Sequence, residues 1–253
     1  HGTRTQHLTL CSDSGRWPGT SSTTQLAKLA AAAGNAIVNV PATRWLLTQT
    51  LPSMRHGGFV GGAELFDAHA FGISPGAAAA MDPQQRLLLE AGYAAAHGAS
   101  MRGVDLLDHN VTVCVGLMNT DFANISSSES VFAATGTQLS IASGRLAFAL
   151  GTQGPCVSID TACSSALVAL NAAMLSLSAD ASIDMALVAV ANLVLLPTVA
   201  RLFARAGMLA DDGRCKTFDQ CANGYVRAEG IGALSLAEKD AESVVGGCVV
   251  RAD

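Results

Sequence analysis

The stretch SIDTACSSALVALNAAMLSLS, residues 158–178, decides the fold expected of this chain. It overlaps PCVSID, residues 155–160, which carries the β-branched Val157 and Ile159 after the turn-forming GTQG and is predicted to be a short buried strand. From Ala162 onward Ala, Leu, Val and Met fall on every face, which predicts a helix buried on all sides. A strand that leads directly into such a helix indicates a layered fold.

The corner between this strand and this helix contains Cys163. A cysteine in the first turn of a helix lies beside unpaired backbone N–H groups and the positive end of the macrodipole, which favour the thiolate. Small neighbours leave room for a substrate carbonyl, and N–H groups of the turn could help to stabilise an oxyanion. Cys163 is the candidate nucleophile, although the pattern alone leaves a buried structural cysteine open. Ser164 and Ser165 are weaker candidates, because no GxSxG motif is present.

The segment DTACSSALVAL, residues 160–170, closely resembles the active-site signature of the β-ketoacyl synthase domains of type I polyketide synthases. Three further segments resemble that family in order and spacing. They are GGFVGGAELFDAHAFGISPGAAAAMDPQQRLLLE at 57–90, SGRLAFALGTQGP at 143–155 and GRCKTFDQCANGYVRAEG at 213–230. The whole chain is therefore interpreted as similar to a ketosynthase.

The resemblance implies a thiolase-like fold with alternating layers, α/β/α/β/α. The chain is expected to form its N-terminal half, with a mostly parallel mixed sheet and a buried nucleophile helix. The alternation of strand-like and helix-like segments between Asn110 and Leu196 independently argues for a mostly parallel α/β sheet covered on both faces. Other starts are local: Ser74-Pro75 predicts a helix start, and Asp82-Pro83 with Gln85 predicts a capping box.

The activity implied by the resemblance is a decarboxylative Claisen condensation in polyketide or fatty acid biosynthesis, performed by an acyltransferase of the 3-oxoacyl-carrier synthase type. An acyl group moves from its carrier to Cys163, and a carrier-bound malonyl unit is decarboxylated to a carbanion that attacks it. The resemblance implies no directly bound cofactor, since the substrates are carried on the phosphopantetheine of an acyl carrier protein. It leaves the substrate-binding residues unassigned.

The family's cysteine works with two histidines and a lysine from the second half of the domain. Here no histidine follows His109, and the two downstream lysines, Lys216 and Lys239, do not stand in the family's lysine context. Family spacing places neither His69 nor His109 beside the cysteine. Residues 1–253 are therefore expected to be a partial ketosynthase domain that lacks the C-terminal half with the histidine motifs. The opening HGTRT, residues 1–5, echoes such a motif at the wrong end of the chain and is interpreted as coincidence.

Two alternatives remain. One is a thiolase-type acyltransferase relative with the same cysteine, although MDPQQRLLLE and GRCKTFD favour a ketosynthase. The other is a non-catalytic scaffold half that dimerises. In thiolase-like folds the strand before the nucleophile pairs across the dimer, so the strand from Pro155 to Asp160 is the predicted interface of a homodimer.

Composition limits the remaining function classes. The formal net charge of −5 and the lack of a basic run give no footprint for nucleic acid. Seven cysteines without paired spacing favour a reducing compartment, cytoplasmic or organellar, and Cys215 and Cys221 lack the histidine partners of a zinc site, so no metal is expected. The apolar run 185–200 is broken by Asn192 and Pro197, which predicts a buried strand and turn and no membrane span.

Overall fold

The computed structural model describes residues 8–47, 50–99, 106–107, 109–118, 120–126, 130–238, 244–245 and 248–250. The chain forms two compact units. Unit 1 comprises His1–Gly15, Glu64–Ala191 and Ile231–Asp253, and unit 2 comprises Arg16–Ala63 and Asn192–Gly230. The opening residues 1–5 and Lys239, considered above, lie outside the described residues.

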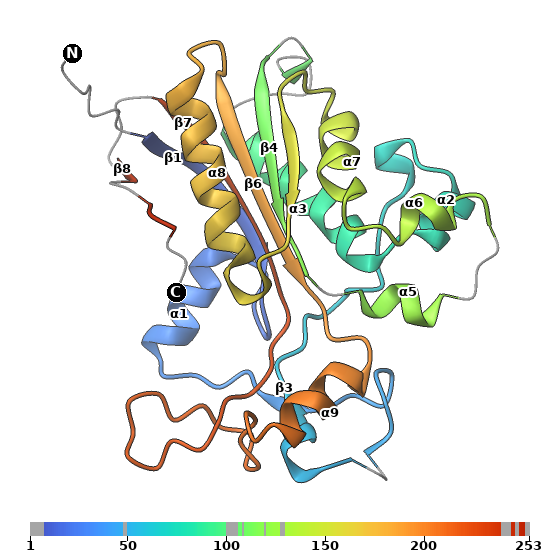
Figure 1. Cartoon of the computed structure of the whole chain (residues 1–253), viewed down its shortest axis with the longest axis vertical. Coiled ribbons are helices and arrows are strands. Elements are labelled where there is room, and N and C mark those ends of the chain that lie inside the picture. The colour runs from blue at the N-terminus through green and yellow to red at the C-terminus, as the bar shows by residue number, and fades with distance from the viewer. Residues whose placement is uncertain are drawn as a thin grey trace. The chain divides into compact units, whose positions relative to one another are not determined.

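Unit 1 is built on a mixed sheet, in which the described residues form six strands with the order β5-β4-β6-β7-β1-β8 (Figure 1). Strand β4 is parallel to both β5 and β6, whereas β8 is antiparallel to β1. The predicted α/β class with a mixed sheet is confirmed. The strands are β1 Leu8–Arg16, β4 Val111–Gly116, β5 Cys156–Ile159, β6 Met185–Asn192, β7 Gly230–Glu238 and β8 Val244–Val245.

Strand β4 lies between β5 and β6 and is covered on both faces. Its sequence VTVCVG is buried at all six positions, as expected for a parallel strand covered on both sides. Val113 pairs with Cys156 of β5 and with Leu187 of β6, and these pairs fix the register of the three strands. Strand β6 also confirms the prediction that the apolar run beginning at Met185 is a strand.

Helices cover both faces of this sheet. Helix α8 (Ser165–Ala179) lies on one face, and α3 (Pro83–Gly98) and α7 (Ile141–Leu150) lie on the other (Figure 1). Under α8 the core contains Cys114 of β4 and Ala186 of β6. A Cβ at Gly92 of α3 would come within 2.7 Å of Leu146 of α7, so this glycine permits the close approach of the two helices. The shorter helices of unit 1 are η3 His69–Phe71, α2 Pro75–Ala80, α5 Asp121–Ile125, α6 Ala133–Gly136 and η4 Ala162–Ser164.

The prediction that the nucleophile helix is buried on all sides is wrong for the described chain. Helix α8 buries one stripe, Ser165, Ala169, Ala173 and Leu177, spaced by four residues. Leu167 and Leu175 are 64% and 61% exposed. An apolar sequence shows that every face of the helix could be buried. The described residues cover only the face of α8 that contacts the sheet.

Residues Ala162–Ala179 are the one helix in the described part of the chain long and apolar enough to cross a membrane, with a mean hydropathy of 1.5. Length and composition alone are weak evidence for a span, because helices that cover a sheet pass the same test. In this fold the buried stripe of α8 packs against β4.

Strand β5 was predicted to be buried, and this is also wrong. The strand is present, but among the strands that the structure describes it lies at the end of the order, with β4 as its one neighbour. Cys156 is exposed and Val157 is 41% exposed. Edge position depends on how distant strands pair, which the local apolar pattern does not report.

One predicted helix start is confirmed and the other is corrected. Ser74 caps α2 by accepting a hydrogen bond from the Ala77 N–H, as predicted. Asp82 caps α3 by accepting from the Gln84 N–H at 2.8 Å. Gln85 does not close a capping box, because its Oε1 accepts from the Arg145 Nε at 2.8 Å and the Asp82 N–H donates to the Gly136 carbonyl at 2.9 Å. The Gln85 amide nitrogen donates to the carbonyls of Gly136 and Gln138, 51 and 53 residues away.

Unit 2 contains short elements joined by loops. Strands β2 (Val38–Asn39) and β3 (His56–Gly57) form an antiparallel pair. Helix α9 (Pro197–Arg205) packs on the 3-10 helix η2 (Pro52–Met54). Helix α1 (Thr23–Ala31) begins after Ser22, whose side chain accepts a hydrogen bond from the Gln25 N–H.

Candidate active site

Cys163 lies on η4, the single turn that joins β5 to α8 in unit 1. The turn follows the carboxyl end of β5, beside the carboxyl end of the parallel strand β4. The thiol-bearing residue is exposed. The structure therefore places Cys163 where a substrate can reach it, at the edge of a parallel sheet where α/β proteins commonly bind ligands.

The turn that carries Cys163 is strained and tightly hydrogen-bonded. Ala162 has a φ of 55°, in the left-handed region that non-glycine residues rarely adopt. Its N–H donates to Oδ1 of Asp160 at 3.0 Å. The N–H of Thr161 donates to the Ser165 hydroxyl at 2.9 Å. The N–H groups of Thr161 and Ala162 are thus engaged within the turn itself.

A glycine in the neighbouring strand lets this turn lie close to the sheet. A Cβ at Gly116, the last residue of β4, would come within 2.7 Å of the Ser165 carbonyl oxygen. Real Cβ atoms do not approach a backbone oxygen so closely. Gly116 is therefore required for the first turn of α8 to pack on β4 as it does.

The two serines after Cys163 are used locally. The Ser164 hydroxyl donates to the Thr161 carbonyl at 2.8 Å, and the Ser165 hydroxyl donates to the Ala162 carbonyl at 2.7 Å. A hydroxyl whose proton is held by a backbone carbonyl is not activated by a general base. The structure thus disfavours both as rival nucleophiles.

Of the candidate bases, His109 lies at the opposite end of the sheet from Cys163. His109 precedes β4, and its Nδ1 lies 2.9 Å from Oδ2 of Asp184, which precedes β6. These residues mark the amino ends of the parallel strands, about 20 Å from the carboxyl ends for six residues at roughly 3.3 Å each. His69 lies on η3 in an exposed position.

Lys216 of unit 2, one of the two lysines downstream of Cys163, also has local partners. The Lys216 ammonium lies 2.7 Å from Asp212 and donates to the Asn223 side chain at 2.8 Å. Among the residues that the structure describes, no group of three or more His, Cys, Asp or Glu side chains could hold a metal ion.

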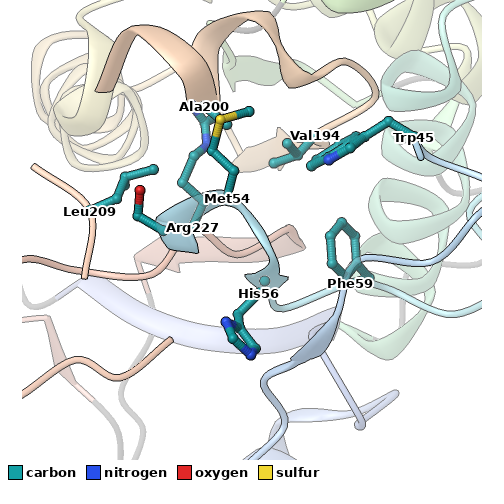
Figure 2. A pocket seen from close by; sticks show the side chains of 10 residues that line it. Trp45, Met54, His56, Phe59, Val194, Ala200, Leu209 and Arg227 are labelled. Atoms are coloured by element: carbon teal, nitrogen blue, oxygen red, sulfur yellow. The ribbon is translucent and has the colours of Figure 1, made fainter. Parts of the chain in front are cut away.

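A small cavity lies within unit 2, lined by residues of η2, β3 and α9 (Figure 2). Its volume of about 10 Å³ has room for about one water molecule. Nε1 of Trp45 and Nδ1 of His56 line it, are buried and have no hydrogen-bond partner among the described residues. The cavity suits a bridging water and is too small for an acyl chain.

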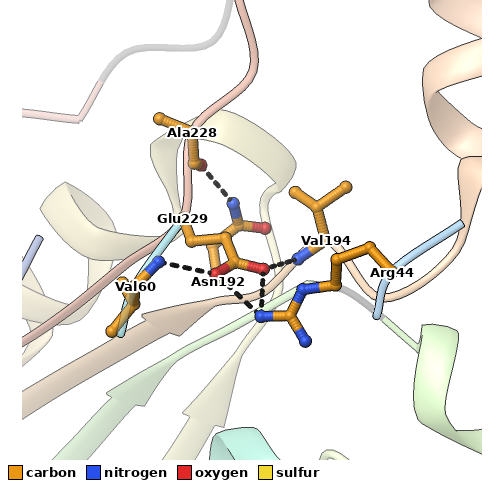
Figure 3. A network of polar contacts seen from close by, with 6 residues as sticks. All are labelled: Arg44, Val60, Asn192, Val194, Ala228 and Glu229. Atoms are coloured by element: carbon orange, nitrogen blue, oxygen red, sulfur yellow. Dashed lines mark hydrogen bonds and ion pairs between the residues drawn. The ribbon is translucent and has the colours of Figure 1, made fainter. Parts of the chain in front are cut away.

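A buried carboxylate organises unit 2, and the sequence reasoning missed it (Figure 3). The Glu229 side chain is fully buried and accepts the N–H groups of Val60 and Val194, each at 2.9 Å. The Arg44 guanidinium lies 3.1 Å from it. Burial raises the pKa of Glu229, while the two N–H donors and Arg44 oppose that shift. The GYVRAEG motif contained this residue, but nothing local indicated its distant partners.

A second buried acid caps α3 in unit 1. Asp82 is 1% exposed, and burial raises its pKa to about 6. The Gln84 N–H and the Arg86 charge oppose the shift, and the nearby Asp121 adds to it. Asp121 is also buried, at the start of α5.

The comparison with protein families bears directly on this arrangement. The family model described as "Beta-ketoacyl synthase, N-terminal domain" matches residues 10–242. The chain belongs to the β-ketoacyl synthase family. The predicted family and its thiolase-like fold are confirmed.

The relatives of this β-ketoacyl synthase chain are large polyketide synthases. It is 40% identical over 243 residues to a phenolphthiocerol/phthiocerol polyketide synthase of Mycobacterium tuberculosis, covering 89% of the chain and 11% of that protein. It is 37% identical over 240 residues to polyketide synthase PksL of Bacillus subtilis, covering 91% of the chain and 5% of that protein. The chain thus spans a small fraction of these relatives.

A solved ketosynthase shares the fold. The ketosynthase from module 6 of the bacillaene synthase of Bacillus subtilis, a cysteine-to-serine variant, superposes with a TM-score of 0.84 at 34% identity. The match covers 92% of this chain and 40% of that one. This β-ketoacyl synthase chain thus corresponds to about two-fifths of that ketosynthase.

Proposed function

We propose that the chain supplies the nucleophile of a β-ketoacyl synthase of polyketide biosynthesis, and that Cys163 is that nucleophile. The observation that carries this proposal is the exposed Cys163 on a strained turn at the carboxyl edge of the sheet. Strained backbone at an exposed reactive group is typical of functional sites. The family match across residues 10–242 supports the same interpretation.

The proposed chemistry has two half-reactions. In the first, the Cys163 thiolate attacks the carbonyl of an acyl thioester on the phosphopantetheine of an acyl carrier protein. The carrier C–S bond breaks, and the carrier thiolate leaves and takes up a proton. In the second, a malonyl thioester loses carbon dioxide, and its carbanion attacks the Cys163 thioester. A C–C bond forms and the cysteine thiolate is released. The histidine and lysine partners implied by the resemblance do not lie beside Cys163 among the described residues.

The first half-reaction can be tested with a small acyl donor. The chain is incubated with butyryl-N-acetylcysteamine and examined by mass spectrometry. One butyryl adduct, located at Cys163 and absent from Cys163→Ala, supports the proposal. Cys156→Ala is the matched control, since Cys156 is also exposed, on the preceding strand. Equal acylation of all exposed cysteines, unchanged in Cys163→Ala, would refute it.

We further propose that two copies pair through the edge strand β5, between Pro155 and Asp160. A strand at the end of a sheet presents unpaired N–H and C=O groups to a second chain. The exposed side chains of Cys156 and Val157 lie on this strand. Light scattering tests this: Val157→Lys is expected to shift a dimer to monomer, whereas Leu175→Lys on the exposed face of α8 is not. A dimer that persists in Val157→Lys contradicts the β5 interface.

An acidic carrier protein is the partner that the charge distribution favours. Unit 2 has nine Lys and Arg residues against four Asp and Glu residues, a net charge of +5 within a chain of net charge −5. Arg201 and Arg205 are exposed one turn apart on α9, and neither has a carboxylate partner among the described residues. We propose that these arginines contact the carrier. Such contacts raise the rate of association more than the affinity and weaken with salt.

The carrier surface is tested by stopped-flow association with an acyl carrier protein at several salt concentrations. Arg201→Glu with Arg205→Glu is expected to slow association at least tenfold at low salt and to flatten its salt dependence. Lys28→Glu, a charge reversal on α1, serves as the control. Equal slowing by the control would remove the assignment to α9.

The compartment is proposed to be a reducing one, cytoplasmic or organellar. The support for this proposal is the sequence, whose seven cysteines lack the paired spacing of a disulfide framework. Seven titratable thiols in the protein denatured directly from cells would support this. Fewer than seven would contradict it.

A further inference from the structure

Ser165 makes two hydrogen bonds back to the turn that carries Cys163. Its Oγ accepts the Thr161 N–H at 2.9 Å and donates to the Ala162 carbonyl at 2.7 Å. The residue is 5% exposed, so water cannot readily replace its hydroxyl at these backbone groups. One side chain thereby connects the residues on both sides of the Thr161–Ala162 peptide to the first turn of α8.

The backbone that this hydroxyl holds is the strained one. Ala162 adopts a φ of 55°, in the left-handed region where the Cβ of a non-glycine residue is crowded by the carbonyl oxygen that follows it. Such conformations persist only where neighbouring groups hold them. Asp160 binds the N–H of Ala162, and Ser165 binds its carbonyl. The strained residue is therefore held on both of its backbone polar groups.

The opposite side of Ser165 is fixed by the sheet. The Ser165 carbonyl oxygen packs closely on Gly116 of β4, and a Cβ added to Gly116 would lie 2.7 Å from it. Strand β4 therefore limits movement of the first turn of α8 in that direction. The Ser165 hydroxyl thus connects a rigid element, α8 packed on β4, to the backbone dihedrals of the turn. Cys163 lies between the two connected points in the sequence.

We infer that Ser165 is a positioning residue that holds Ala162 in its left-handed conformation and so fixes where the Cys163 thiol is presented. The inference rests on the proposed function in taking Cys163 as the nucleophile, but the geometry of the turn can be measured without acyl transfer. The chemistry remains that of the thiol. Ser165 does not contact the reacting atoms.

The test is competitive alkylation of the full chain with iodoacetamide, read as the rate at Cys163 relative to the rate at Cys221. Cys221 is an exposed cysteine of unit 2 and serves as an internal reference. Ser165→Ala is expected to change this ratio at least threefold. Ser176→Ala should leave the ratio unchanged, because the Ser176 hydroxyl donates to the Ala172 carbonyl near the other end of α8. An unchanged ratio in a folded Ser165→Ala protein overturns the inference.

A second variant separates positioning from general stability. Glycine adopts positive φ without strain, so Ala162→Gly should make the turn less dependent on the Ser165 hydroxyl. In the Ala162→Gly background, Ser165→Ala is expected to change the ratio by less than twofold, even if both variants melt at a lower temperature. A change of threefold or more there contradicts the inference, also if Ser165→Ala alone fails to fold.

These results are independent of acyl transfer. Should no acyl thioester modify Cys163 while the alkylation ratios follow the expected pattern, the proposed function fails and the positioning role stands. If Cys163 accepts an acyl group but Ser165→Ala changes neither the rate of acyl transfer nor the alkylation ratio, the positioning role fails and the proposed function stands.

Discussion

Arg44 and Glu229 form an ion pair of 3.1 Å in unit 2, although 185 residues separate them in the sequence. The Glu229 carboxylate also accepts the N–H groups of Val60 and Val194 (Figure 3). One buried side chain therefore joins both segments of unit 2. Because the carboxylate is wholly enclosed, water cannot replace it as the hydrogen-bond acceptor of the Val60 and Val194 N–H groups.

Removal of this carboxylate is predicted to destabilise the protein strongly. Glu229→Ala leaves Arg44 and two N–H groups without their buried acceptor, which costs roughly 3–5 kcal/mol for breaking a buried pair. Urea denaturation followed by fluorescence of the tryptophans, both of which lie in unit 2, measures this loss. Glu64→Ala, at an exposed glutamate, should have an effect below about 0.5 kcal/mol. Equal denaturation midpoints for the two variants would contradict the account of the network.

Asp82 is predicted to make stability depend on pH. Its folded pKa is about 6 against an ordinary value of 3.8, so its contribution is fully present below pH 3.8 and is lost as the pH rises through 6. Between pH 4.5 and 7.5 the loss should be roughly 2 kcal/mol at 1.36 kcal/mol per pKa unit.

The matched variant is Asp82→Asn. Asparagine keeps an acceptor for the Gln84 N–H and is a good N-cap, but it does not ionise. The fall in stability between pH 4.5 and 7.5 should therefore be smaller in the variant, measured by urea denaturation at both pH values. The same fall in the wild type and Asp82→Asn would show that Asp82 is not the source.

Gly116 is predicted to be intolerant of even one methyl group. The Cβ introduced by Gly116→Ala would lie 2.7 Å from the Ser165 carbonyl oxygen. Overpacking of this kind lowers the free energy of unfolding by roughly 1–3 kcal/mol. The displaced first turn of α8 should also alter alkylation of Cys163. Gly144→Ala is the control, because a Cβ there meets nothing within 4 Å and its helix gains the better propensity of alanine. A thermal melt in which Gly116→Ala is as stable as Gly144→Ala would contradict the close packing.

Local sequence predicted the elements whose cause is local. The apolar β-branched run of β4 and the Ser74 cap of α2 were found because periodicity and cap chemistry act over a few residues. The corner with Cys163 was found in the same way, from a strand pattern followed at once by a helix pattern.

Distant pairing accounts for what the sequence could not predict. Val157 is exposed because β5 is an edge strand, and strand order is a property of the whole sheet. Leu167 is exposed because apolar composition does not say which residues cover a helix. Gln85 binds carbonyls more than 50 residues away rather than its own helix start. The left-handed Ala162 gave no sequence signal, since alanine rarely adopts that conformation.

Acceptance of an acyl group from a carrier by Cys163 distinguishes a catalytic role for this chain from a purely structural one. The most direct measurement is the transfer of a radiolabelled butyryl group from the phosphopantetheine of an acyl carrier protein to this chain, with the labelled residue located by fragmentation of its peptides. We expect label on Cys163, lost in Cys163→Ala and retained in Cys156→Ala. A folded chain that takes no label, or carries it equally on Cys156, Cys215 and Cys221, would rule out specific acyl transfer to Cys163 and favour a scaffold without catalysis.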